Sequence, residues 1–243
     1  MATKACALCL EHRPLCNSHI VPEFLYAKLY NEKHQTMGIH GRGNDGFGLL
    51  QKGLRERLLC KACESLINLK YEIPFRQAWI DSRALPPGVW TFGETRVVRV
   101  PYSHFKLFHL SVLYRAAIAK RRTYSGVTLS LDEIIRLRRM ILAGDPGPVG
   151  RYRIAALAAI HHRSHELVEM ISSPQIVSDH GRRFFQMMYG GVEWTIKLSS
   201  ASHLTFDKRT LNAAGEMPVL GWDWREIPAI QMAGAALRGE IRT

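Results

Sequence analysis

The sequence lacks long apolar runs. The best of them, Ile154 to Ile160, is far shorter than the roughly 18 residues that a membrane-spanning helix needs. The first residues, Met-Ala-Thr-Lys-Ala-Cys, contain no apolar signal core, so we expect a soluble, non-secreted, cytoplasmic protein. A Walker loop, a Gly-x-Ser-x-Gly elbow and a dinucleotide fingerprint are also missing, which argues against the enzyme classes that carry them.

Acidic residues are scarce, and the stretch between Glu94 and Asp132 has none. The chain contains 33 Lys and Arg against 21 Asp and Glu, a net charge of +12 with neutral histidines. Such a surface favours nucleic acid as a partner, because neutralising phosphates releases counterions. One alternative is a generally basic protein whose arginines cap helices and cover apolar surface. Another is a protein-binding module whose basic face meets an acidic partner. The basic residues of the stretch are Arg96, Arg99, Lys106, Arg115, Lys120, Arg121 and Arg122.

The five cysteines do not suggest a disulfide framework, because four of them form two Cys-x-x-Cys pairs. Each pair places two thiolates on one side of a turn, and two pairs complete a tetrahedral zinc shell with no open position. We therefore predict a structural zinc site made by Cys6, Cys9, Cys60 and Cys63 in a reducing compartment. The alternative is four ordinary reduced cysteines, two of them in a redox-type motif. The fifth, Cys16, is expected to be a small buried residue.

The patterns divide the chain into residues 1–73 and 74–243, with an α+β fold. The first part has a knuckle at the first cysteine pair, a helix after Pro22 and a glycine-rich loop from Gly38 to Gly53 with a hairpin at its end. A helix then starts at the second cysteine pair and runs to Pro74. Knuckle, hairpin region and helix in this order are the layout of a treble-clef finger.

The second part is predicted to mix helices with antiparallel strands, without repeats. A helix from His104 to about Arg122 is expected after an N-cap at Ser103, and a capping box starts another at Ser130. That helix should end near Gly144. The remaining expectations are strands within Gly88–Val100, a hairpin over Arg183–Leu198 that turns at Gly190-Gly191, and an aromatic loop followed by a short helix from Trp222 to Arg242.

Residues inside the finger carry a family resemblance. The segment Ser18-His19-Ile20-Val21-Pro22-Glu23 follows the first pair, and Glu64 follows the second. These motifs, over about the first 70 residues, resemble the His-Asn-His (HNH, ββα-metal) nucleases with a supporting zinc. The resemblance implies that His19 is the general base that activates water against a phosphodiester. It also implies that Glu64 holds a divalent metal such as Mg²⁺ or Mn²⁺, for which a carboxylate is a suitable ligand.

The motif departs from the family pattern at three positions. Ser18 replaces the metal-binding Asp or His, Glu64 replaces the final histidine, and Arg55 lies where the family often has asparagine. The leading hypothesis is a metal-dependent, HNH-like endonuclease acting on DNA, for which analogy alone suggests a role in phage defence or mobile-element biology. The alternative is a catalytically inactive, zinc-stabilised nucleic-acid-binding or adaptor protein, in which Glu64 complements the helix N-terminus and His19 fills the finger. Phosphate contacts are assigned to Arg55, Arg57, Lys61, Arg115, Lys120, Arg121 and Arg122.

Other histidines suggest weaker sites. His161 and His165 would share a helix face, next to Glu166, but a basic, partly exposed face is favoured over a second metal site. His34 and His40 flank the glycine-rich loop, and Asn44 could take the missing asparagine role. The sequence leaves these possibilities open.

Overall fold

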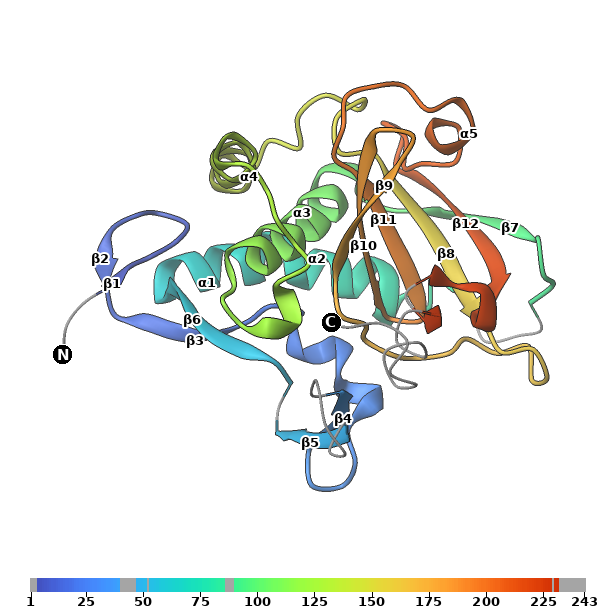
Figure 1. The fold of residues 1–243 in the computed structure, drawn as a ribbon, viewed down its shortest axis with the longest axis horizontal. Helices are drawn as coiled ribbons and strands as arrows, with labels where there is room; N and C mark the ends of the chain where they lie inside the picture. Colours follow the sequence, from blue (N-terminus) through green and yellow to red (C-terminus); the bar gives the residue numbers. More distant parts are fainter. Residues whose placement is uncertain (1–3, 40–46, 52, 86–89, 229, 232–243) are drawn as a thin grey trace.

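The computed structural model describes residues 4–39, 47–51, 53–85, 90–228 and 230–231, which form the mixed α+β fold predicted from the sequence (Figure 1). Among these residues, no helix combines the length and the apolar character needed to cross a membrane. The strands are β1 Lys4–Ala5, β2 His12–Arg13, β3 Leu15–His19, β4 Gln35–Ile39, β5 Phe47–Gln51, β6 Arg55–Cys60, β7 Thr95–Arg99, β8 Ile154–Ile160, β9 Gln175–Asp179, β10 Arg182–Tyr189, β11 Val192–Lys197 and β12 Glu216–Asp223.

Short helical turns connect these strands, and three longer helical stretches lie between them. The α-helices are α1 Lys61–Ile67, α2 Ile73–Phe75, α3 Tyr102–Ile118, α4 Leu131–Ala143 and α5 Leu204–Asp207. The 3₁₀ turns are η1 Glu23–Leu25, η2 Ala27–Leu29, η5 Arg122–Tyr124 and η6 Trp224–Glu226, and the π-helical segments are η3 Asn68–Glu72 and η4 Arg76–Asp81.

The N-terminal part consists of three two-stranded antiparallel pairs, β1–β2, β3–β6 and β4–β5. The pair β4–β5 lies within the connection from β3 to β6 and is the hairpin expected near the glycine-rich loop. The rest of that loop, residues 40–46 with His40 and Asn44, lies outside the described residues. The helix expected after Pro22 consists instead of the two 3₁₀ turns η1 and η2.

One helical stretch follows β6 and continues from α1 through η3 and α2 to the end of η4 at Asp81. The prediction that it ends at Pro74 is wrong. Two π-helical segments flank this proline, and their wider hydrogen-bond spacing accommodates a residue that has no N–H. Tyr71, Phe75 and Trp79 recur every four residues on its buried face, so packing against the core holds the stretch together.

The C-terminal part contains a six-stranded sheet in the order β7-β12-β8-β11-β10-β9. Only the β12–β8 pair is parallel, and the other neighbours are antiparallel. The predicted hairpin is confirmed as β10–β11, and its turn residues Gly190 and Gly191 have φ of +61° and +74°. These left-handed conformations explain why glycine occupies both positions.

Helix α3 is the central helix of the fold, and side chains are buried on all of its faces between Phe105 and Ala116. It starts after Pro101, so the predicted N-cap at Ser103 is wrong. It also ends at Ile118 rather than near Arg122. The backbone N–H groups of Lys120 and Arg121 donate to the Glu56 carboxylate instead of continuing the helix.

The capping box of α4 is confirmed. The Ser130 hydroxyl accepts from the Glu133 backbone N–H, the Glu133 carboxylate accepts from the Ser130 N–H, and Gly144 ends the helix with φ of +71°. The boundary predicted between residues 73 and 74 falls inside the helical stretch that follows β6. One hydrophobic cluster also contains residues from both sides of that boundary, and the division into two domains stays a prediction.

Candidate metal centre and surrounding site

The four cysteines of the two predicted pairs come together at one end of the N-terminal part. Cys6 and Cys9 lie in the turn between β1 and β2, Cys60 ends β6 and Cys63 lies in the first turn of α1. Their sulfur atoms all lie within 4.8 Å of one another. The predicted grouping is therefore confirmed, and the cluster is compatible with a structural metal site.

The surroundings of the sulfur atoms favour the thiolate at Cys6 and the neutral thiol at Cys9 and Cys63. Cys6, Cys60 and Cys63 are buried and Cys9 is half-buried. Burial opposes ionisation of Cys6, but backbone N–H donors from Cys9, Cys60 and Leu8 outweigh it and lower its pKa to about 7. One of these donors, the Cys60 N–H, lies 3.2 Å from the Cys6 sulfur. Burial raises the pKa of Cys9 and Cys63, so these two thiols favour the neutral form unless a cation compensates the charge of the thiolate.

Contacts from the C-terminal part hold the β1–β2 turn in place. The Tyr114 hydroxyl of α3 donates to the Ala7 carbonyl at 2.5 Å, and the Arg138 guanidinium of α4 donates to the Leu8 carbonyl at 3.0 Å. The fifth cysteine, Cys16, is half-buried rather than buried. It lies in β3 where the pairing with β6 shifts register.

The other residues of the predicted catalytic motif lie on the elements around this cluster. His19 is the last residue of β3, opposite Arg55, and is half-buried. Ser18 is buried and its hydroxyl accepts from the Leu59 backbone N–H at 3.3 Å, so this hydroxyl is committed to the β3–β6 pair. Glu64 lies in the first turn of α1, which packs against both β3 and β6. One carboxylate oxygen of Glu64 is buried and has no hydrogen-bond partner among the described residues.

Basic residues from distant parts of the sequence meet along β6. The Arg121 guanidinium donates to the Arg55 carbonyl at 2.8 Å, and Glu56 binds the backbone of the residues after α3. The side chains of Arg57, Lys61, Lys120, Arg121 and Arg122 are exposed, whereas Arg55 is half-buried.

Arg115 does not belong to this basic surface, and its predicted phosphate contact is wrong. Its side chain is 1% exposed and pairs with Glu72 at 2.8 Å. The sequence contained a signal for this burial, because Arg115 follows Phe108 and Val112 at seven- and three-residue spacing on α3. Lys106, on the same helix, is also buried, and burial lowers its pKa to about 8.

The segment that contains His161, His162 and His165 is not a helix, because β8 ends at Ile160 and a turn follows. In this turn the Nδ1 atom of His161 faces the Ser164 backbone N–H at 3.2 Å, and that of His165 faces the Trp90 carbonyl at 2.9 Å. The Trp224 indole donates to His162 Nδ1. In the part of the chain that the structure describes, these histidines form no metal-binding group.

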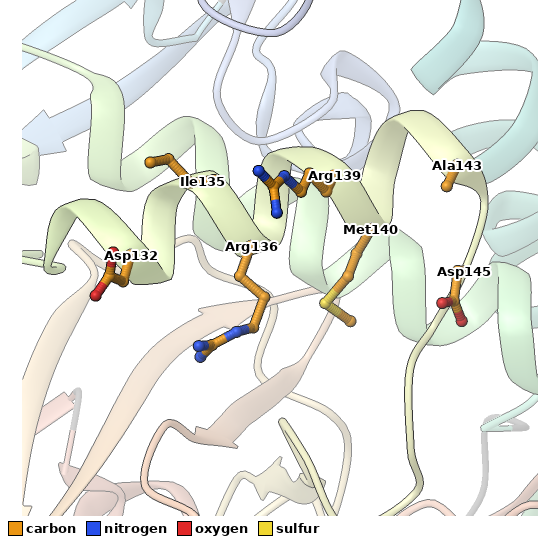
Figure 2. Close-up of a pocket in the computed structure, with 7 residues that line it drawn as sticks. All are labelled: Asp132, Ile135, Arg136, Arg139, Met140, Ala143 and Asp145. Carbon is orange, nitrogen blue, oxygen red and sulfur yellow. The ribbon is translucent and has the colours of Figure 1, made fainter.

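Two further features lie apart from the cysteine cluster. His34 is exposed, and its ring lies 5.7 Å from that of Tyr30. A groove of about 420 Å³ runs along α4 and contains none of the predicted site residues (Figure 2). It is lined by Asp132, Ile135, Arg136, Arg139, Met140, Ala143 and Asp145.

Comparisons of the chain with known proteins identify no relative. No protein-family model matches the chain, and no curated protein or solved structure matches it. The function of the site must therefore be inferred from the chemistry of its own residues.

Proposed function

We propose that the four cysteines hold a structural zinc ion in a treble-clef or ββα-metal module. A tetrahedral shell with Zn–S bonds of about 2.3 Å separates its sulfur atoms by about 3.8 Å. The Cys9 and Cys60 sulfur atoms lie 3.8 Å apart, which supports this fit. The order of elements also supports it, since a knuckle, the β3–β6 pair and a helix that starts at the second cysteine pair succeed one another along the chain.

We infer that the module is the active site of a metal-dependent endonuclease acting on DNA. The observation that carries this proposal is a buried Glu64 oxygen that finds no hydrogen-bond partner among the described residues, on the helix that packs against the strand ending in His19. A buried anionic oxygen is costly unless a cation or a donor satisfies it. Glu64 therefore fits a role as a ligand for Mg²⁺ or Mn²⁺, which stabilises charge on phosphate oxygens when bound.

The protein residues then have separate roles. The His19 imidazole accepts a proton from the attacking water. Glu64 supplies one carboxylate, which is a common arrangement for Mg²⁺ because water and substrate phosphate complete its shell. Arg55 and Arg57 bind phosphates along β6 and Lys61 binds one at the start of α1, while Lys120, Arg121 and Arg122 bind those beside the Arg55 end of β6.

A second candidate, a binding module without catalysis, has one observation in its favour. Ser18 lies at the position of a metal ligand in the HNH pattern, but its hydroxyl is turned inward to the Leu59 N–H. The site then offers a divalent ion one anionic side chain from this motif. In this candidate the same basic residues bind DNA and the zinc module is a scaffold.

Plasmid nicking with added Mg²⁺ or Mn²⁺ distinguishes the two candidates. The wild type should nick DNA, and His19→Ala and Glu64→Ala should each lose nicking while they retain zinc, fold and DNA affinity. His180→Ala is the matched control, because this histidine is exposed in the turn between β9 and β10. A wild type that binds DNA but cuts it with neither metal contradicts the enzyme and supports the binding module.

DNA affinity against salt concentration tests the partner. Changing Lys120, Arg121 and Arg122 together to Gln should reduce the slope of log K against log salt by about 2.7, if each contacts one phosphate. The control replaces three exposed basic residues elsewhere, Arg163, Lys208 and Arg209, with Gln. Equal slopes for both triple variants and the wild type would show that the residues after α3 bind no phosphate.

A further inference from the structure

A single buried guanidinium joins three separate elements next to the proposed site. The Arg115 Nη1 atom of α3 donates to the His19 carbonyl at 2.9 Å and to the Glu72 carboxylate at 2.8 Å. Its Nε donates to the Ser111 carbonyl at 3.2 Å, within α3 itself. The guanidinium therefore connects the end of β3 and the helical stretch after β6 to the central helix.

The contacts of Arg115 restrain the backbone of His19 at the point where the pairing between β3 and β6 ends. The regular pairing of β3 with β6 ends at His19 and Arg55, and the next contact, from the Ile20 N–H to the Leu54 carbonyl, is long at 3.4 Å. Arg115 supplies a charged donor at this point. Charge-assisted hydrogen bonds are stronger than neutral ones, and a guanidinium places its donors in a rigid plane.

Glu72 fixes the guanidinium in turn. It lies in η3, two turns beyond Glu64 on the same helical stretch, and its side chain is 15% exposed. Water has little access to either charged group. The ion pair is therefore not replaced by contacts with solvent, and the guanidinium keeps its orientation. The backbone of His19 and the helix that bears Glu64 are therefore held by the same side chain.

We infer that Arg115 is a positioning residue, which holds the His19 imidazole in place through the His19 carbonyl. This inference rests on the proposed function for its catalytic consequence, and it gives the C-terminal part a role in the site. A displacement of about 1 Å is enough to reduce a reaction rate about 100-fold. Loss of the guanidinium should therefore lower kcat and leave the KM for DNA unchanged, because Arg115 is too buried to touch DNA.

The test uses Arg115→Met combined with Glu72→Gln in the full-length protein, so that no buried charge is left unpaired. Arg183→Met combined with Glu133→Gln is the matched control, because Arg183 likewise pairs with a carboxylate and donates to a backbone carbonyl, at Thr128 rather than at His19. Zinc content and circular dichroism establish that each variant folds. Arg115→Lys is the conservative variant, and we expect its kcat to lie between those of the double variant and the wild type. A lysine ammonium can donate to one of the two acceptors, but it lacks the planar guanidinium that donates to both.

Two readouts report on His19 directly. In the double variant, hydrogen exchange over residues 17–22 should be at least about 10-fold faster, and the His19 ring resonances, assigned with His19→Ala, should broaden or split. The control should show neither change. If the double variant folds and leaves both readouts as in the wild type, the positioning role is overturned. Because neither readout needs cleavage, a wild type without nuclease activity would overturn the proposed function and leave this result standing.

Discussion

Removal of one cysteine of the proposed zinc site should unfold the N-terminal part of the protein while the six-stranded sheet stays folded. The perturbation is Cys60→Ala. Cys60 is buried, ends β6 and donates its N–H to the Cys6 sulfur. Its matched control is Cys16→Ala, since Cys16 lies on the neighbouring strand and outside the four-cysteine cluster.

The magnitude follows from the chain that the metal closes. Cys9 and Cys60 are 51 positions apart, and a cross-link that closes such a loop raises the free energy of the unfolded chain by about 4 kcal/mol at 25 °C through lost conformational entropy. Metal–thiolate bonding adds to this, and structural zinc contributes about 10–16 kcal/mol in finger peptides. Since a whole domain is stable by only about 5–15 kcal/mol, we expect the β1–β2 and β3–β6 pairs to unfold when the proposed metal is lost.

Elemental analysis and hydrogen exchange followed by mass spectrometry provide the measurement. Wild type and Cys16→Ala should contain about one zinc per chain, and Cys60→Ala should contain far less. Exchange should become fast in residues 4–20 and 54–63 of Cys60→Ala and stay slow in β10 and β11. Tryptophan fluorescence is a poor substitute, because all five tryptophans lie beyond residue 73. Wild-type protein without metal, or slow exchange throughout Cys60→Ala, would refute the reasoning.

Three further predictions concern the fold. In the folded protein the pKa of Lys106, lowered to about 8 by burial, lies below its unfolded value of about 10.4, so the unfolded state binds more protons between these values. Wild-type stability in urea should therefore rise from pH 8 to pH 9.5 by on the order of 1–2 kcal/mol, and Lys106→Met should lack this rise. Ser130→Ala removes the capping hydroxyl of α4 and should cost about 1 kcal/mol in thermal or urea unfolding, whereas no loss would contradict the cap. Gly215→Ala should cost more than about 2 kcal/mol, because φ is +78° and a Cβ would lie 2.1 Å from the Val100 carbonyl; an unchanged melting temperature would refute this.

Signals that depend on neighbours in sequence predicted the structure well. The spacing within each Cys-x-x-Cys pair, the capping box at Ser130 and the turn at Gly190-Gly191 each involve a few consecutive residues, and all three are confirmed. The grouping of the two cysteine pairs was also predictable, although they are far apart in the chain. A closed shell of four thiolates requires both pairs. The ligand number of zinc therefore predicted that the two pairs lie together, although the sequence contains no distances.

Contacts between distant parts of the chain decided what the sequence alone could not. The helical stretch continues past Pro74 because its buried aromatic residues pack on the core, and α3 ends early because Glu56 captures the N–H groups that follow it. Arg115 looks like a surface charge in a basic stretch, yet Glu72 and the His19 carbonyl make its burial favourable. Each outcome is a competition between a local preference and a tertiary contact. The sequence determined the local preference, and only the folded chain brought the competing partner within hydrogen-bond distance.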